Sequence, residues 1–411
     1  MQPSRKQRVL FLFALALATF FRLSNLGGPP LWGDETLAAG AQYLSLDSLF
    51  DELRNRDSIK APIDPPGYHL LNRWFHPLLA DPAKAMFTAT GRFFLRLLSA
   101  LSGIALVGAV LLLVRQLGER DRAWLPALLV AFSFYGVYYS QENRPYAAVA
   151  LTAVVSAWLL LRLVESADRR LVPAYAVCLA LTAYLHYVAA MVLAAHLLVL
   201  AASYLLPRSE GHEWKGRTWA WVGLALGAAL YLPWLGQTLN LAVRPELFQP
   251  HISEAGGDVP AAWRMLGAAL LHVGCGSTAS LVFYAPLAVF GFVGVWRRER
   301  LGALLIAAHY AVPVMYLAAS GFGQFFHPRY LIFIFPMHQL LAGWGIVEIT
   351  IASANRRAVL RRRPWLVPAA FLIVLFALNA MALGEYYRYG IKCASDAPAF
   401  AEFCARYIES F

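Results

Sequence analysis

The residues best suited to chemistry are charged side chains that stand directly beside long apolar stretches. Glu142 and Arg144 lie within residues 138–148, which separate two such stretches. An acidic pair, Asp34 and Glu35, follows another. Charged groups in such surroundings are costly to keep and indicate a functional site. The pattern predicts a site in which a carboxylate takes up a proton and a guanidinium binds an anion.

The acidic pair Asp34 and Glu35 has three interpretations. A partly desolvated carboxylate can act as the general base for a hydroxyl group. The two side chains can equally hold a divalent cation, or Asp34 can cap a helix that begins at the next residue. The preceding segment GGPPLWG is typical of a turn, which would fix the pair in place.

Two arginines are candidate anion clamps. Arg144 lies between Glu142 and Tyr146, and Arg329 directly precedes a later apolar stretch. The guanidinium fork forms paired, charge-assisted hydrogen bonds with phosphate or carboxylate groups. The alternatives are an internal pair between Glu142 and Arg144, and contacts of either arginine with lipid headgroups.

A tyrosine and two histidines extend the candidate site. Tyr68 and His69 follow a rigid Asp-Pro-Pro-Gly turn that starts at Asp64, and residues 68–79 predict an interfacial amphipathic helix. His186 lies at another turn, where a structural role and a ligand role both stay open. No cluster has metal-ligand spacing, and there is no phosphate-binding glycine loop.

The elements that must position these residues are membrane-spanning helices. The 411 residues are 59% hydrophobic and 14% charged, whereas soluble domains carry about 25% charged residues. About eleven apolar stretches are long enough to cross a hydrocarbon core of roughly 30 Å, and only helices suit them. The stretches are residues 9–26, 94–117, 123–140, 145–164, 171–186, 187–206, 218–239, 280–297, 301–320, 329–351 and 365–384. Residues 171–206 are either two short helices or one long tilted helix.

The basic residues predict the orientation in the membrane. More than half of the 35 Lys and Arg residues lie on the short connections of one side, which is therefore cytoplasmic. Residues 1–26 then form an uncleaved first span with a cytoplasmic N-terminus in the cell membrane, with a signal peptide as the alternative. In either case the candidate site is extracytoplasmic. The net charge of +11 is explained by orientation and membrane lipids rather than by nucleic acid.

The predicted organisation is one transmembrane domain, residues 1–384, followed by a short extracytoplasmic tail, residues 385–411. Residues 27–93 form a large first outer loop that carries the acidic motif and interfacial helices. In the tail, Cys393 and Cys404 form a disulfide or remain two free thiols.

The order of the motifs resembles the PMT-like integral-membrane glycosyltransferases, which include protein O-mannosyltransferases and lipid A aminoarabinose transferases and have the GT-C fold. The resemblance rests on the DE pair, the PP-containing loop and YYSQENRPY. It extends through ALTAYLHYVAAMVLAAHLLV, LYLPWL and HPRYLIFIFP, and so covers most of the chain.

This resemblance implies an all-α GT-C enzyme that uses a sugar carried on a polyprenyl phosphate. The acceptor would be a hydroxyl group of a lipid, a glycan or a protein, and the linkage would be inverted. Asp34, with Glu35 beside it, would be the base, while Arg144, oriented by Glu142, and Arg329 would hold the phosphate. It implies no certain cofactor and leaves a divalent cation open.

The chain departs from the family pattern in two places. Asp64 stands where a histidine commonly precedes the two prolines, which leaves His69 as an unproven substitute. The tail is too short for the large outer domain of some relatives.

Two other classes of protein compete with the enzyme. A secondary transporter or lipid flippase would use the outer-face charges as a substrate pathway, but it predicts charged groups deep in the spans. Only His196 and His309 fit that expectation. A non-catalytic scaffold would not need the outer-face acids.

Overall fold

The computed structural model describes residues 4–54, 65–78, 86–187, 190–206, 214–242, 278–320 and 328–389, with the single residues Gly267 and Leu270. Every regular element in this part of the chain is a helix, which confirms the predicted all-α fold class. The predictions on Asp64, Cys393 and Cys404 fall outside the described residues.

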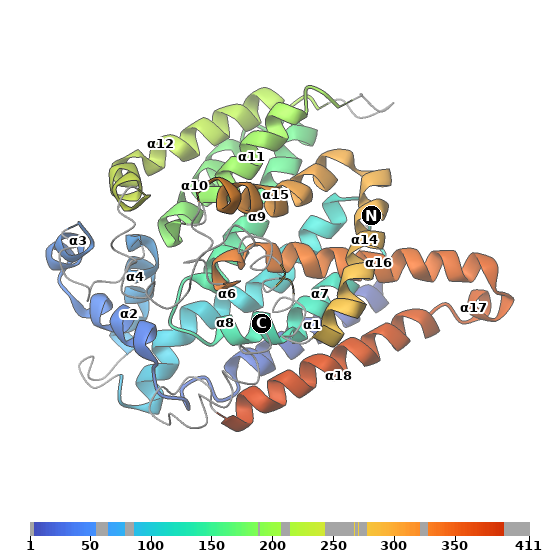
Figure 1. Cartoon of the computed structure of the whole chain (residues 1–411), viewed down its shortest axis with the longest axis horizontal. Helices are drawn as coiled ribbons and strands as arrows, with labels where there is room; N and C mark the ends of the chain where they lie inside the picture. The colour runs from blue at the N-terminus through green and yellow to red at the C-terminus, as the bar shows by residue number, and fades with distance from the viewer. Residues whose placement is uncertain are drawn as a thin grey trace.

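The long helices form one bundle (Figure 1). They are α1 (Arg5–Leu23), α6 (Ala89–Gln116), α9 (Tyr146–Ser166), α12 (Arg217–Ala242), α14 (Thr278–Arg298), α15 (Arg300–Ser320), α16 (Ile334–Arg356) and α18 (Leu366–Tyr389). Among the described residues, six helices are long and apolar enough to cross a membrane: α6, α9, α12, α14, α16 and α18. The number of about eleven spans stays a prediction.

Residues 171–206 contain two helices, which answers the question that the sequence left open. They are α10 (Leu171–Leu185) and α11 (Ala190–Ala202), of 15 and 13 residues. Both are shorter than the roughly 20 residues that a straight crossing of the hydrocarbon core needs.

Short helices between α1 and α6 form a separate lobe at one end of the bundle (Figure 1). They are α2 (Gly33–Tyr43), α3 (Leu46–Arg54), α4 (Pro66–Asn72) and the 3-10 helix η1 (Arg73–Leu78). The predicted amphipathic helix corresponds to α4 and η1, but its N-terminal half packs inward. Tyr68 and His69 are buried, whereas Trp74 in η1 is 82% exposed.

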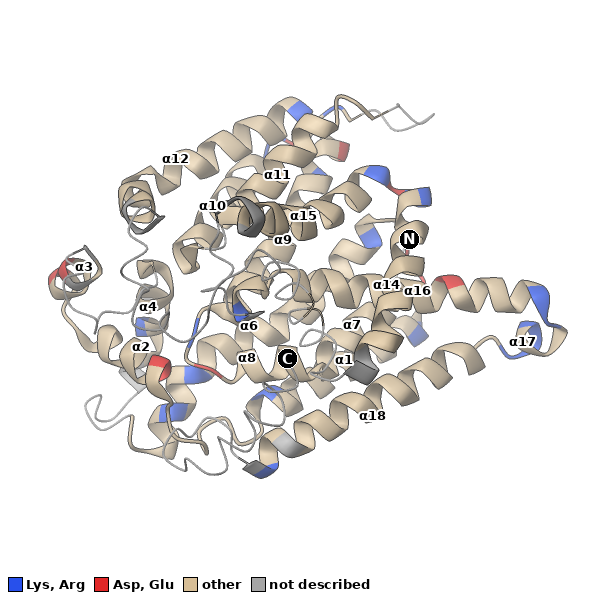
Figure 2. Cartoon of the chain, in the orientation of Figure 1, with Lys and Arg blue, Asp and Glu red and all other residues tan. Residues whose placement is uncertain are grey.

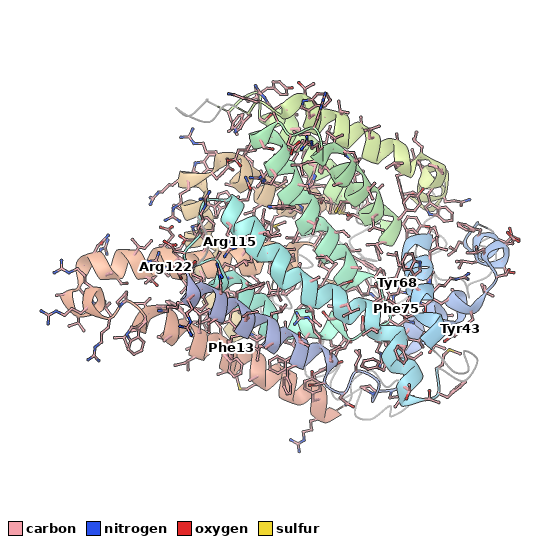
Figure 3. All side chains as sticks on the ribbon, turned by 180° about the vertical axis from the view of Figure 1, so that it is seen from behind. Phe13, Tyr43, Tyr68, Phe75, Arg115 and Arg122 are labelled. Carbon is pink, nitrogen blue, oxygen red and sulfur yellow. The ribbon has the colours of Figure 1, made fainter. Side chains whose placement is uncertain are left out.

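The lobe and the arginines of a short basic connection lie toward opposite ends of the molecule (Figure 3). Tyr43 and Tyr68 lie in the lobe at one end, and Arg115 and Arg122 lie toward the other. This separation agrees with the sequence pattern, which puts the candidate site and the short basic connections on opposite sides.

A close helix crossing in the core joins α14 to α16 through glycines. A Cβ atom added at Gly345 would lie 2.0 Å from the carbonyl oxygen of Leu287, and one at Gly291 would lie 1.9 Å from that of Leu341. The backbones therefore touch directly, as small residues allow in membrane bundles.

The stretch 123–140 differs from its prediction, because it is broken rather than continuous. It consists of α7 (Trp124–Phe132) and α8 (Phe134–Ser140), which are separated by Ser133 in an extended conformation with φ −60° and ψ 126°. A break of this kind leaves backbone groups without helical partners, and water is scarce at membrane depth.

Two polar side chains supply the missing partners at this break. Arg22 of α1, fully buried, donates to the carbonyl oxygens of Val130 and Ala131 at 3.0 and 2.8 Å. The side-chain oxygen of Asn379 in α18 accepts from the backbone N–H of Phe134 at 2.7 Å. The break is therefore stabilised by hydrogen bonds with α1 on one side and α18 on the other.

Candidate active site

A buried ion pair anchors the acidic motif to the bundle. Arg96 of α6 binds both carboxylate oxygens of Glu35, with distances of 2.8 Å from Nε and 2.7 Å from Nη2. Both side chains are 0% exposed. Arg96 also donates to the carbonyl oxygens of Leu26, Pro29 and Pro30, which belong to the turn before α2. One guanidinium therefore fixes the turn and the start of α2 together.

Sequence reasoning missed Arg96 as a functional residue. The available signal was an arginine inside the apolar stretch 94–117, and an ionisable group in a span implies a partner. That partner is Glu35. The structure consequently gives Glu35 no contact with solvent, whereas its neighbour Asp34 has a side chain that is 32% exposed.

Asn143 joins the segment between α8 and α9 to the outer lobe. Its backbone N–H donates to Glu35 Oε1 at 2.6 Å. Its side-chain oxygen accepts from Asn72 at 2.9 Å, Gln42 at 3.1 Å and the Tyr68 hydroxyl at 3.3 Å. Burial raises the pKa of Tyr68 above its ordinary value, so the hydroxyl stays a neutral donor. These bonds hold the two predicted motifs in fixed positions relative to each other.

Asp34 and Arg329 meet at the edge of this network. Asp34 Oδ2 lies 3.1 Å from Arg329 Nη1, and Arg329 belongs to the 3-10 helix η5 (Pro328–Leu331). The guanidinium lies over the rings of Trp32, Tyr330 and Tyr146, with its carbon 5.4, 5.4 and 5.9 Å from their centroids. The predicted base and a predicted anion clamp, about 300 residues apart in sequence, are therefore side by side and partly exposed.

The second predicted clamp, Arg144, lies against the same aromatic ring. Its guanidinium carbon is 5.6 Å from the centroid of Tyr146, so this ring contacts both Arg144 and Arg329. Its carbonyl oxygen accepts from Ser99 Oγ at 2.7 Å, and Ser99 in turn contacts the Tyr68 hydroxyl at 2.8 Å. Arg144 is 7% exposed, which places it deeper than Arg329.

The predicted histidines occupy different positions. The ring of His186 lies 5.7 Å from Tyr146 and 5.3 Å from Tyr330, so it belongs to the aromatic group around Arg329. His69 is fully buried next to Tyr68, at a ring distance of 6.3 Å. Glu142 is also buried, at 1% exposure.

The acidic pair does not fit a shared cation in this arrangement. Both carboxylate oxygens of Glu35 bind Arg96, so Arg96 balances the charge of Glu35. Arg329 balances the charge of Asp34 in the same way. In the described part of the chain, no group of three or more His, Cys, Asp or Glu side chains is placed to hold a metal ion. The site contains one accessible carboxylate, that of Asp34, and the guanidinium groups of Arg329 and Arg144 beside aromatic rings. These groups are suited to accepting a proton and binding an anion.

Comparison with known proteins supports the resemblance that the motifs indicate. Residues 76–236 match the family model described as dolichyl-phosphate-mannose-protein mannosyltransferase. No curated protein matches the chain in sequence.

Solved structures share the fold at low sequence identity. ArnT from Cupriavidus metallidurans in the apo state aligns with a TM-score of 0.61 and 15% identity over 91% of this chain and 76% of that one. The same protein bound to undecaprenyl phosphate aligns with a TM-score of 0.58 and 16% identity over 90% of this chain and 74% of that one.

A second solved structure is the Archaeoglobus fulgidus oligosaccharyltransferase AglB in complex with an inhibitory peptide and a dolichol-phosphate. It gives a TM-score of 0.56 and 11% identity over 91% of this chain. The alignment covers 55% of AglB, so the chain spans about half the length of that protein. Together with the helical architecture, these likenesses establish the GT-C fold, and the family match over residues 76–236 supports the PMT-like resemblance.

Proposed function

Starting from a PMT-like protein with the GT-C fold, we propose that the chain transfers a single sugar from a polyprenyl-phosphate carrier to a hydroxyl acceptor. The observation that carries the proposal is the pair formed by Asp34 and Arg329. It combines a partly exposed base with a phosphate-binding guanidinium at a distance of 3.1 Å.

The nature of the donor is supported by the relatives. One ArnT structure is bound to undecaprenyl phosphate, and one AglB structure contains a dolichol-phosphate. The family model is named for dolichyl-phosphate-mannose. A lipid phosphate is thus the shared feature, and this chain has two arginines to receive it, Arg329 and Arg144.

The proposed reaction is an in-line displacement at the anomeric carbon. The acceptor oxygen forms a bond to this carbon, and its proton passes to the Asp34 carboxylate. The bond to the carrier phosphate breaks, and its electron pair stays on the departing phosphate. Attack opposite the leaving group inverts the linkage, and it requires Asp34 and Arg329, paired at 3.1 Å, to separate when the donor phosphate binds between them. A preorganised guanidinium stabilises the negative charge that develops on the phosphate.

The other predicted residues receive supporting roles in this proposal. Glu35 acts through position, because Arg96 holds its carboxylate away from solvent and Asp34 is the next residue. Tyr146 and His186 form the wall around the clamp. Tyr68 supports Arg144 through Ser99, and Glu142 and His69 lie behind this surface.

The location and the partners belong to the same proposal. The site would face the extracytoplasmic side of the cell membrane, opposite the short basic connections. The acceptor would be a lipid, a glycan or a protein, and the sugar a hexose or a pentose. Vesicle-embedded protein carrying a cysteine at position 34 should react with an impermeant reagent from the extracytoplasmic side. Labelling from the cytoplasmic side alone would refute the orientation.

Consumption of the donor tests the activity. Membranes with the wild type or Asp34→Asn would receive a panel of labelled polyprenyl-phosphate sugars together with native lipid and protein extracts. We expect the wild type alone to release carrier phosphate from one donor, which would also identify the sugar. If the wild type leaves every donor intact in the presence of these extracts, the enzyme proposal fails.

A second candidate function, transport or lipid flipping, is favoured by one observation. His196 and His309 are fully buried and their rings lie 5.8 Å apart, deep in α11 and α15. However, His196 Nδ1 is hydrogen-bonded to the Tyr175 hydroxyl at 2.9 Å, and His309 Nδ1 to the carbonyl oxygen of Leu305 at 2.7 Å. These bonds suit a structural pair. Uptake of a labelled solute by vesicles, abolished in His196→Asn, would favour transport instead.

A further inference from the structure

A cluster of five arginines stands at the tip of the hairpin formed by α16, α17 and α18. Helix α17 spans Ala358–Arg362, and none of its residues is buried. Figure 2 shows this tip projecting beyond the other helices, with basic residues around it. The five residues, here named the tip arginines, are Arg356, Arg357, Arg361, Arg362 and Arg363.

Within the residues that the structure describes, this charge has no acidic partner. No Asp or Glu occurs from residue 349 to residue 384, and in the described part of the chain none of the tip arginines forms an ion pair. Arg298, near the same end of the bundle, differs: it lies 2.9 Å from Glu348 and 3.6 Å from Glu119. The tip therefore presents unpaired positive charge at the surface of the described structure.

The position of the tip between two apolar helices places it at the surface of a membrane. Helices α16 and α18 are both long and apolar enough to cross a membrane. Because the connection between them is short, it must lie at the membrane boundary. Val359 and Trp365 stand among the tip arginines and are 68% and 59% exposed. Exposed tryptophan beside clustered arginine is typical of the headgroup layer.

We propose that the tip binds anionic phospholipid headgroups. The guanidinium forks would contact the lipid phosphates in pairs of hydrogen bonds, while Val359 and Trp365 enter the layer beneath. This goes beyond setting the orientation, because orientation requires positive charge during insertion, whereas the proposed site requires bound lipid in the finished protein.

The same site bears on the stability of α18. Only 17% of the apolar segment of α18 is buried in the protein, compared with 83% of that of α16. Near its other end, the Tyr386 hydroxyl donates to Gln141 Oε1 at 2.8 Å, and Gln141 directly precedes the Glu142–Arg144 motif. Lipid bound at the tip would therefore hold in place a helix that reaches the candidate active site.

Lipid retention and unfolding of the purified full-length protein test this proposal. The wild type and the variant Arg361→Gln/Arg362→Gln/Arg363→Gln would be placed in nanodiscs of phosphatidylcholine, with or without phosphatidylglycerol. We expect phosphatidylglycerol to raise the Tm of the wild type and not that of the variant. Affinity for the anionic lipid should fall roughly 100-fold when three guanidinium groups are lost. An equal Tm rise in both proteins would overturn the proposal.

Two controls separate lipid binding from other effects. Arg169→Gln/Arg170→Gln removes two exposed arginines that lie beside Asp168, and it should keep the full lipid response. If the glutamine variant inserts wrongly, Arg361→Lys/Arg362→Lys/Arg363→Lys keeps the charge but loses the forks. That variant should retain less anionic lipid, and unchanged retention would overturn the role of the guanidinium groups. Stabilisation of the wild type by inorganic phosphate alone, equal to that by phosphatidylglycerol, would show a free-phosphate site and overturn the lipid assignment.

Discussion

The carboxylate of Asp34 and the guanidinium of Arg329 are paired at 3.1 Å. The proposed phosphate clamp therefore already holds an anion, and that anion is the proposed base. A donor phosphate that binds Arg329 has to compete with Asp34, and by doing so it leaves the carboxylate with an uncompensated charge. Donor binding and activation of the base would thus be one event, which predicts that the donor binds before the acceptor.

Removal of the Asp34 carboxylate should change donor binding and turnover in opposite directions. In Asp34→Asn, we expect turnover to fall by at least 10²-fold, because the base is lost. Affinity for polyprenyl phosphate should rise several-fold, because Arg329 no longer has a competing carboxylate. Binding of labelled undecaprenyl phosphate to purified protein measures this. Weaker binding by a folded Asp34→Asn protein would contradict the competition.

The chemistry of the clamp can be tested at Arg329. In Arg329→Gln, we expect the affinity for polyprenyl phosphate to fall by more than tenfold, since a charge-assisted pair of hydrogen bonds is lost. Arg329→Lys should recover only part of it, because lysine lacks the fork. The pair with Asp34 is partly exposed and contributes little to stability, so the Tm should change by only a few degrees. A large loss of Tm without loss of affinity would assign Arg329 a structural role.

The buried pair of Arg96 and Glu35 should behave in the opposite way. Arg96→Leu leaves a buried carboxylate without its partner, and we expect a loss of about 3–5 kcal/mol in the free energy of unfolding. Glu35→Gln in the same protein should restore part of this loss, because no unpaired charge then remains. Unfolding in a mild detergent measures both proteins. Additive losses in the double variant would contradict the pairing.

The sequence predicts the class of the fold, and it singles out the main residues of the candidate site, because both leave local signals. Apolar stretches of span length identify the helices, and acids or arginines at their ends identify Asp34 and Arg329. The motif order adds the PMT-like resemblance. The pairing of these two residues is not local, since Arg329 follows the ninth predicted stretch, and only the packed bundle brings it to the first outer loop.

The elements that the sequence did not predict depend on tertiary partners. The stretch 123–140 is apolar throughout, yet Arg22 and Asn379 stabilise a break at Ser133. Glu35 has the same chemistry as Asp34, and its burial follows from its contact with Arg96 in α6. Periodicity describes single elements, so it cannot show which of two adjacent acids a distant arginine will bind.

The crossing of α14 and α16 predicts a stability effect at one glycine. In Gly345→Ala, the new Cβ would lie 2.0 Å from the Leu287 carbonyl oxygen, and the helices would have to separate. We expect a loss of about 1–3 kcal/mol, the usual range for overpacking. Gly384→Ala in α18 is the matched control, because a Cβ there meets nothing within 4 Å. It should be neutral or gain roughly 0.5–1 kcal/mol from helix propensity. Thermal unfolding of both variants under identical conditions measures the difference, and equal stability would show that the two backbones are not in contact.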